Sequence, residues 1–222
     1  MPKPTLDFIA PEKRERLLCE AARLFAERGF ESADMAELAR RASVAKGSIY
    51  NYFENKEDLY LHVCRDGLTR SREAVFGGLD PSWDIYRQVE HIFLRGARFA
   101  REHPEYVRLY LNVSAAGMER FAERLTMEVE KPTADHLKNL IRSEQRAGRV
   151  RSDLDPRLGA LFINSLYILV LASLVSRHFQ IRLQEYLETE GEPREADVRP
   201  PLRQTIGVIH QLLRPASGTV GG

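Results

Sequence analysis

The amino-acid sequence predicts an all-α protein. Apolar residues recur three and four positions apart along most of the chain, which is the period of an amphipathic helix. No stretch alternates apolar and polar residues between turn signals, as a half-buried strand would. Proline and glycine fall at the ends of the periodic stretches, where they favour helix starts and stops.

Three helices are expected in the first quarter of the chain. The first runs from Pro11 to about Arg28, and Gly29 ends it as a C-terminal cap. A short helix follows from Asp34, a suitable N-cap, to Arg41. After a tight turn, a second short helix covers about 45–53. The apolar stripe of the first helix consists of Leu17, Leu18, Ala21, Leu24 and Phe25.

Longer helices are expected beyond residue 60. Asn55 caps the next helix, with Asp58 at the capping-box position. Asp80-Pro81 and Asp155-Pro156 each combine an N-cap with a first-position proline, so a helix should start at each. His103-Pro104 marks a break between two helices.

The last part of the chain predicts three more helical stretches. Pro132 should kink or split the stretch 118–147, and Gly148 is its C-terminal cap. A long helix is expected from Pro156 to about Leu187. A final helix from Leu202 to Leu213 carries its apolar residues on one face.

Composition places the chain among soluble globular proteins. Of 222 residues, 43% are hydrophobic and 29% are charged, and the net charge of +1 means that any attraction for nucleic acid must be local. Cys19 and Cys64 lack metal-ligand spacing, and we expect two buried thiols in a reducing cytoplasm. The first residues lack the pattern of a secretory signal, so we expect a cytoplasmic protein.

An enzyme is the first alternative to a binding protein. The six histidines are scattered, and no pair has a metal-binding spacing such as i, i+4. Neither a nucleophile elbow nor a phosphate-binding glycine loop is present in the sequence. We therefore expect no catalytic residues, no metal and no cofactor.

The stretch 158–175 has no charged residue and is long enough to be a membrane-span candidate. Asn164, Ser165 and Ser173 interrupt it, and tryptophan anchors are absent. A helix that is apolar all round can instead be buried on every side within a protein. We favour the buried helix, so we expect no membrane partner, with a membrane-spanning helix as the alternative.

Residues 34–56 predict a helix-turn-helix, because two short helices joined by a tight turn follow a longer one. In this motif the second short helix enters the major groove of DNA. Ile49 and Phe53 should face inward, with Val44 under the turn. The residues left for DNA suit phosphate contact, close backbone approach and reading of base edges. They are Lys46, Gly47, Ser48, Tyr50, Asn51 and Lys56. A small helical subdomain with merely solvated lysines would show the same pattern.

The stretch "LCEAARLFAERGFESADMAELARRASVAKGSIYNYFENKEDLYLHV" resembles the N-terminal domain of TetR-family transcriptional regulators. The resemblance covers residues 14–63, and it implies that the third helix recognises DNA. Three places depart from the usual pattern. Ser43 stands where glycine commonly makes the turn, Ala45 replaces a Ser or Thr cap, and Ala33-Asp34 replaces a Thr/Ser pair. These changes predict weaker or differently specific DNA binding.

The resemblance also implies the domain organisation and the partners. Residues 1–54 would be the helix-turn-helix DNA-binding domain, residues 55–214 a helical ligand-binding and dimerisation domain, and residues 215–222 a disordered tail. The last two helices would pair with those of a second copy to form a homodimer. Candidates for the interface and the core are Leu158, Leu161, Phe162, Leu166, Leu169, Leu174, Val175, Ile206, Ile209 and Leu213.

The function implied is a ligand-responsive transcriptional regulator, with repression as the expected mode. It would bind a palindromic double-stranded DNA operator and be released by an apolar or aromatic small molecule. The effector candidates are Tyr86, Phe93, Tyr110, Phe121, Asn164 and Tyr167. The alternatives are an effector-insensitive DNA-binding adaptor of the same fold and a membrane-tethered DNA binder that uses the stretch 158–175.

Overall fold

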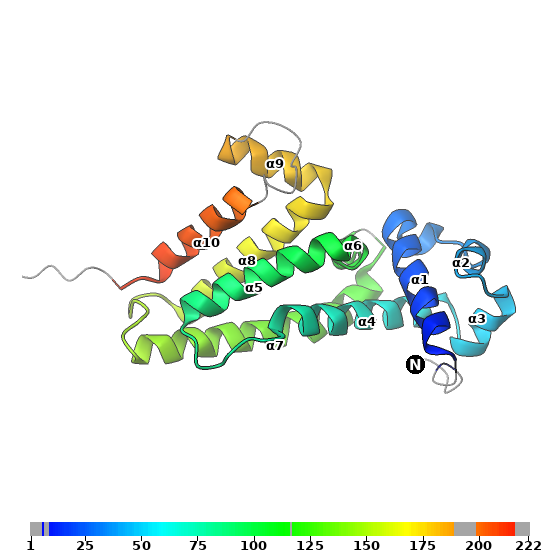
Figure 1. Cartoon of the computed structure of the whole chain (residues 1–222), viewed down its shortest axis with the longest axis horizontal. Helices are drawn as coiled ribbons and strands as arrows, with labels where there is room; N and C mark the ends of the chain where they lie inside the picture. The colour runs from blue at the N-terminus through cyan, green and yellow to red at the C-terminus, as the bar shows by residue number, and fades with distance from the viewer. Residues whose placement is uncertain (1–5, 7–8, 116, 189–198, 216–222) are drawn as a thin grey trace, which may run out of the picture. The chain divides into compact units, whose positions relative to one another are not determined.

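The computed structural model describes residues 6, 9–115, 117–188 and 199–215, and the regular structure in these residues is entirely helical (Figure 1). The chain forms two compact units. The N-terminal unit comprises Met1–Arg72 and His103–Leu125, and the C-terminal unit comprises Glu73–Glu102 and Thr126–Gly222. The predicted all-α class, with an N-terminal helix-turn-helix followed by a helical part, is confirmed.

The N-terminal unit is built around α1, which packs against α2 and α6, while α2 packs against α3. The helices in this unit are α1 (Pro11–Ser32), α2 (Met35–Arg41), α3 (Lys46–Tyr52), most of α4 (Lys56–Phe76), α6 (Pro104–Asn112) and the first residues of α7 (Glu119–Arg146). Its core holds four aromatic rings from α1, α4 and α7. Phe30 meets Phe121 at 4.9 Å between ring centroids, and Tyr60 meets Phe25 at 5.1 Å and Phe121 at 5.0 Å. Such edge and tilted contacts are the favoured geometry for aromatic pairs.

The helix ends of the N-terminal unit follow the sequence closely. Gly29 takes a left-handed φ of 71° and interrupts the regular turns of α1, which continues to Ser32 beyond this break. Asp34 caps α2 by accepting from the Ala36 N–H at 2.9 Å. Asn55 accepts from the Asp58 N–H at 2.8 Å, and the Asp58 carboxylate accepts in turn from the Glu54 N–H at 3.2 Å. These bonds satisfy donors that a helix start leaves unpaired.

The C-terminal unit packs α5 (Ile85–Glu102) against α8 (Pro156–Val175) and α10 (Arg199–Leu213), with α9 (Arg177–Leu187) on α8. Most of α7 completes it. Its core includes the fully buried Ile85, Ala97, Ile141, Ile209 and Leu213. The predicted starts at Pro104 and Pro156 are confirmed, and Asp155 accepts from the Arg157 N–H at 2.8 Å.

The start predicted at Asp80-Pro81 is wrong, because α5 begins at Ile85. Asp80 accepts from the Ser82 N–H at 2.8 Å and makes a turn, whereas Asp84 accepts from the Arg87 N–H at 2.9 Å and caps α5. Two aspartates of equal capping strength stand close together in the sequence, and local chemistry does not choose between them.

Two further expectations for the C-terminal unit need correction. The long helix predicted from Pro156 to Leu187 is divided at Ser176, whose φ of −125° and ψ of 122° are extended rather than helical. Pro132 does not split α7, which runs through it without interruption. The Thr133 hydroxyl donates back to the Val129 carbonyl at 2.9 Å within the same turn.

Helix α8 is long and apolar enough to cross a membrane by length and composition. Core helices of soluble proteins share these properties. Here α8 packs on α5, α9 and α10, and part of its surface is buried against them. The helix is therefore a core element of the C-terminal unit that keeps an uncovered face.

The compact units are a different division from the predicted domains 1–54 and 55–214. Residues of α4 as far as Arg72, together with α6, belong to the same packing unit as α1. A packing unit need not coincide with a functional domain, and the functional limits stay a prediction. The tail predicted at 215–222 lies outside the described residues except for Pro215.

Candidate nucleic-acid interface

The turn between α2 and α3 contains one residue in a strained backbone conformation, and it accepts a hydrogen bond from a side chain of α1. Ser43 has a φ of 54°, in the left-handed region that favours glycine. The residue before it, Ala42, is fully buried, and its carbonyl accepts from Arg16 Nε at 2.8 Å. The Arg16 contact was not foreseen from the sequence, because it joins residues far apart in the chain. Together these features fix the angle between α2 and α3.

Helix α3 is anchored by its inward side. Ile49 is completely buried and Phe53, which ends the helix, is 1% exposed, while Val44 is half-buried under the turn. The Phe53 N–H donates to the Ile49 carbonyl at 2.9 Å. This confirms the predicted inward face, and it leaves the opposite side of a helix of only 7 residues facing outward.

The outward side of α3 carries the residues predicted to bind DNA. Lys46, Gly47, Tyr50 and Asn51 are exposed, and Ser48 is half-buried. The ring of Tyr50 is among the exposed large side chains of the molecule. Hydroxyl, amide and ammonium groups on one short helix can contact phosphates and base edges together.

Nothing among the described residues requires a glycine at position 47. In this part of the chain a Cβ at position 47 would meet no atom within 4 Å, and the φ of Gly47 is not in the left-handed region. Glycine costs a helix roughly 0.5–1 kcal/mol relative to alanine. A glycine that destabilises its helix, and that packing within the protein does not require, is expected where the backbone of another molecule or a DNA base must approach closely.

The start of α3 lacks a side-chain cap. Ala45 occupies the N-cap position with extended dihedral angles, and its methyl side chain makes no cap hydrogen bond. The departure noted at this position in the sequence therefore has a physical consequence. A Ser or Thr here would satisfy one of these donors.

Lys56 is engaged within the unit. Its Nζ donates to the Glu31 carbonyl at 2.8 Å and lies 4.9 Å from the centroid of the Phe30 ring. The sequence predicted a phosphate contact for this side chain, which stays a prediction. Because an ammonium group has three donors, one internal hydrogen bond leaves two for another partner.

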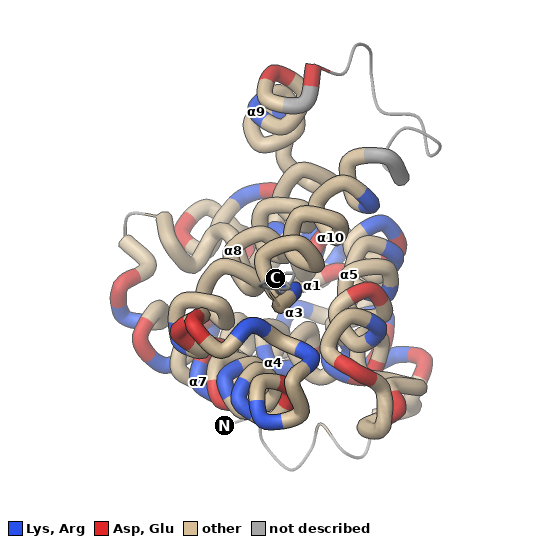
Figure 2. The backbone as a smooth tube through the Cα atoms, turned by 90° about the vertical axis from the view of Figure 1, so that its left-hand side faces the viewer, with Lys and Arg blue, Asp and Glu red and all other residues tan. Residues whose placement is uncertain are grey.

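The charges around the motif are partly neutralised. Arg41 pairs with Glu27 at 2.9 Å and with Glu37 at 2.5 Å, and these hydrogen bonds raise the pKa of its guanidinium. Figure 2 shows Lys and Arg interspersed with Asp and Glu along the helices. The local positive charge on α3 therefore comes from Lys46, with the exposed Arg40 nearby at the end of α2.

The six predicted effector residues lie in both units. Tyr110 and Phe121 belong to the N-terminal unit, where Phe121 is part of the aromatic core described above. Tyr86, in the C-terminal unit, donates its hydroxyl to the Arg149 carbonyl at 2.8 Å, and its ring meets that of His210 at 5.1 Å. These contacts of Phe121 and Tyr86 stabilise the packing within their own units.

The structure brings the other three effector candidates together within the C-terminal unit. The rings of Phe93 and Tyr167 meet at 5.2 Å, and Tyr167 lies so close over Gly96 that a Cβ there would collide with it. Burial raises the pKa of the Tyr167 hydroxyl. Asn164, on the same helix as Tyr167, donates to Glu130 Oε2 at 3.0 Å. The sequence indicated that Asn164 needs a partner, but it did not identify Glu130.

An uncovered apolar face lies on α8. Leu158 is 62% exposed, Leu161 63% and Phe162 53%, and their spacing of three and four puts them on one side of the helix. Val208 on α10 is 52% exposed. The remaining candidates divide between half-buried residues of α8 and the buried Val175, Ile206, Ile209 and Leu213. The structure thus distinguishes the candidates that lie in the core from those that are exposed, whereas the sequence did not separate these two groups.

Cys19 and Cys64 are half-buried rather than buried as expected. Burial raises the pKa of Cys19 to about 11, which keeps it protonated at neutral pH. Among the residues that the structure describes, no group of three His, Cys, Asp or Glu side chains could hold a metal ion.

Comparison with known proteins places this geometry in a family. Residues 17–63 match the family described as "Bacterial regulatory proteins, tetR family". The HTH-type transcriptional repressor Rv1474c of Mycobacterium tuberculosis is 27% identical over 195 residues, which cover 85% of this chain and 95% of that protein. The uncharacterized HTH-type transcriptional regulator YdgC of Bacillus subtilis is 30% identical over 154 residues, which cover 65% of this chain and 71% of that protein.

The fold agrees over nearly the whole chain. A crystal structure of a TetR family transcriptional regulator from Chloroflexus aurantiacus matches with a TM-score of 0.70 at 21% identity, covering 96% of this chain and 99% of that one. The helix-turn-helix, with Ile49 and Phe53 inward and Lys46, Gly47, Tyr50 and Asn51 outward, lies inside the matched residues. On this motif and these relatives, the chain belongs to the TetR family of helix-turn-helix transcriptional regulators and is not an enzyme.

Proposed function

We propose that the protein is a cytoplasmic, homodimeric repressor that binds a palindromic operator and is released by a small molecule. The observation that carries this proposal is the outward side of α3, where Lys46, Gly47 and Asn51 are exposed on a firmly anchored helix. The name of the related Rv1474c, a transcriptional repressor, supports repression as the mode.

On DNA, α3 would lie in the major groove. Asn51 would read an adenine edge, Lys46 would contact a phosphate or a guanine edge, and Tyr50 would hydrogen-bond a phosphate. Gly47 would let the backbone approach the duplex, and Ser48 and Lys56 would add hydrogen bonds to the backbone of the DNA. A second copy would place the same set one helical turn away, roughly 34–36 Å along the duplex.

The uncovered face of α8, with Val208 of α10, is the proposed dimer interface. Contiguous exposed apolar side chains on a soluble protein mark interaction surfaces. A second copy is the occupant that a palindromic site requires, because two-fold symmetry of the DNA calls for two-fold symmetry of the protein. Leu158, Leu161 and Phe162 would be covered in this dimer.

The effector site is proposed around Phe93, Tyr167 and Asn164. Two aromatic rings with one polar pair, Asn164 and Glu130, suit an apolar or aromatic compound that carries a hydrogen-bonding group. Binding would change DNA affinity only through different affinities for the two states of the protein, typically about 1–3 kcal/mol.

Selection of bound duplexes from a random pool tests the proposal. The expected result is a palindrome whose binding weakens steeply with salt, because each phosphate contact releases counterions. Light scattering on the complex should show two chains per duplex. A protein that enriches no sequence, or that enriches a site without two-fold symmetry, would contradict the proposal.

The effector is tested separately on the selected operator. A panel of apolar and aromatic compounds is screened for release of labelled DNA, with Tyr167→Phe and Phe93→Ala as variants that should lose the response. If no compound releases the wild-type protein while DNA binding is intact, the effector-insensitive adaptor becomes the correct description.

A further inference from the structure

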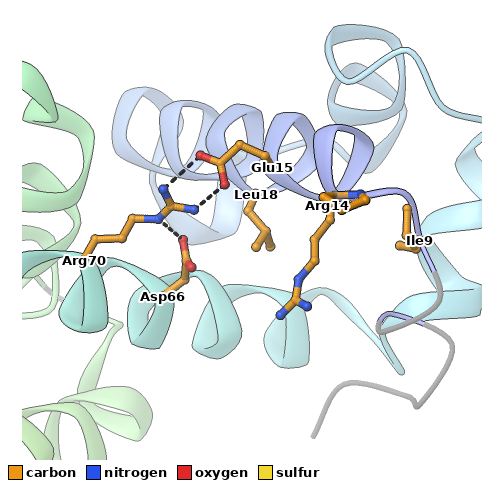
Figure 3. A pocket seen from close by; sticks show the side chains of 7 residues that line it. Ile9, Arg14, Glu15, Leu18, Asp66 and Arg70 are labelled. Atoms are coloured by element: carbon orange, nitrogen blue, oxygen red, sulfur yellow. Dashed lines mark hydrogen bonds and ion pairs between the residues drawn. The ribbon is translucent and has the colours of Figure 1, made fainter. Parts of the chain in front are cut away.

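An ionic cluster joins three helices of the N-terminal unit (Figure 3). Arg70 on α4 donates from its two terminal nitrogens to the Glu15 carboxylate on α1, at 2.9 and 2.5 Å. Its Nε donates to Asp66 Oδ2 at 2.7 Å, and the Tyr106 hydroxyl on α6 donates to the same oxygen at 3.0 Å. One guanidinium thus ties α4 directly to α1, and through Asp66 to α6.

The geometry of the cluster is specific. Two parallel bonds from a guanidinium to a carboxylate fix direction as well as distance. Arg70 lowers the pKa of Glu15 below its ordinary value, so the pair stays charged. Behind it, the Tyr106 ring packs on Gly67 so closely that a Cβ at position 67 would collide with the ring. The three helices are therefore held close together at this point.

The cluster is too exposed to be a main source of stability. The side chains of Arg70 and Glu15 are 27% and 52% exposed, and they border a shallow pocket of about 360 Å³ with Arg14 and Leu18 in its wall (Figure 3). Ion pairs that water reaches contribute little to folding because solvent screens them. A pair of this kind can open and close at small cost, which suits a positioning role.

Its place in the chain links it to α3. Helix α4 is continuous from Lys56, which follows the end of α3 after three residues 53–55, to Phe76. The backbone passes from the N-terminal to the C-terminal unit at Arg72 and returns at His103. Arg70 lies just before the first passage and Tyr106 just after the second. Both residues therefore lie near points where the chain leaves or re-enters the N-terminal unit.

We propose that Arg70 is a positioning residue for DNA binding: its bonds to Glu15 and Asp66 hold α4 against α1 and α6, and thereby keep α3 in the orientation that fits the major groove. The inference rests on the proposed DNA-binding function.

A double-mutant cycle on DNA affinity tests this. Arg70→Met and Glu15→Gln are made singly and together, and binding to the selected operator is followed by fluorescence anisotropy. We expect each single variant to lose about two- to five-fold in affinity, because an exposed ion pair contributes up to about 1 kcal/mol and each 1.4 kcal/mol is about tenfold. The double variant should lose no more than the worse single one, because both remove the same contact. Arg70→Lys, which keeps the charge without the fork, should fall between wild type and Arg70→Met.

The matched control is a second arginine–glutamate pair in the same unit. Arg23 and Glu20 pair at 2.7 Å within α1 and join no two helices. Arg23→Met and Glu20→Gln should leave operator affinity unchanged. Circular dichroism and thermal unfolding are recorded for all variants, and the two sets should shift the melting temperature by similar small amounts.

The outcomes distinguish a failure of the proposed role of Arg70 from a failure of the proposed DNA-binding function. If wild-type protein binds no DNA, the proposed function fails. If wild type binds and the losses at Arg70 and Glu15 are additive, equal to those of the control pair, or explained by unfolding, Arg70 has no positioning role. A non-additive loss in folded variants supports the inference.

Discussion

The outward sides of α3 and α8 are both uncovered, yet their chemistry is opposite. Helix α3 presents an ammonium, an amide, a hydroxyl and a bare backbone at Gly47, whereas α8 presents Leu158, Leu161 and Phe162. Polar groups lose little by staying in water, but an apolar face of this kind gains free energy when it is covered. The surface of α3 is therefore suited to a transient interaction, and that of α8 to a permanent one.

The difference also separates two kinds of evidence. The α3 surface is defined by a dense local motif within residues 17–63, and its inward anchors follow from spacing alone. The α8 surface lies in an 18-residue stretch without charge, where periodicity does not distinguish core from interface. The predictions below test each surface, beginning with the largest expected effect.

Phe162→Glu should break the proposed dimer. A carboxylate buried in an apolar interface without a partner costs several kcal/mol, and each 1.4 kcal/mol is about tenfold, so the dimer should weaken by at least about 100-fold. Operator affinity should fall with it. Sedimentation equilibrium measures the assembly, and Leu94→Glu, at a residue 46% exposed on α5, is the control that should leave it intact. A dimer that survives Phe162→Glu would place the interface elsewhere.

Asn51→Ala should lower both affinity and selectivity. A bidentate contact to a base edge is worth about 1–3 kcal/mol, so binding to the selected operator should fall substantially while binding to unrelated DNA changes little. Competition between operator and scrambled duplex measures the ratio. An equal loss on both duplexes would show that Asn51 contacts the backbone and not a base.

Lys46→Ala should weaken binding almost uniformly across sequences. Loss of one phosphate contact reduces the slope of log affinity against log salt by about 1 per subunit. The slope is measured by titrating salt in the anisotropy assay. An unchanged slope with lost selectivity would instead assign Lys46 to a guanine edge.

Gly47→Ala should change stability and binding in opposite directions. Alanine has room within the chain and favours the helix, so the free energy of unfolding should rise by about 0.5–1 kcal/mol. The new methyl group should at the same time weaken operator binding, because it holds the backbone away from the duplex. Denaturant unfolding and anisotropy on the same sample provide the test. Equal or tighter binding would mean that Gly47 does not approach DNA.

Ala45→Ser should stabilise the N-terminal unit without loss of binding. A serine oxygen can accept from the first N–H groups of α3, which is worth about 0.5–2 kcal/mol. Thermal unfolding measures the gain, and operator affinity should stay equal or improve. Ala147→Ser, at an exposed position outside the motif, is the comparison that should have no such effect.

Sequence reasoning was most reliable where one local rule acted alone. Asp34, Asn55 and Asp155 start helices as their capping chemistry predicts, and Gly29 interrupts the regular turns of α1 without ending it. Reasoning failed at Asp80, where a second aspartate competed for the same role. It also failed at Ser176, where neither proline nor glycine marks the break between α8 and α9.

The sequence by itself determined the all-α class, the helix-turn-helix and the two faces of α3, because helical period and capping act over a few residues. Only the tertiary structure decided which apolar residues of α8 are core and which are uncovered. It also decided that Lys56 bonds Glu31, that Asn164 finds Glu130, and that Arg70 joins α4 to Glu15. These contacts depend on how helices pack, and packing joins residues whose separation along the chain carries no local signal.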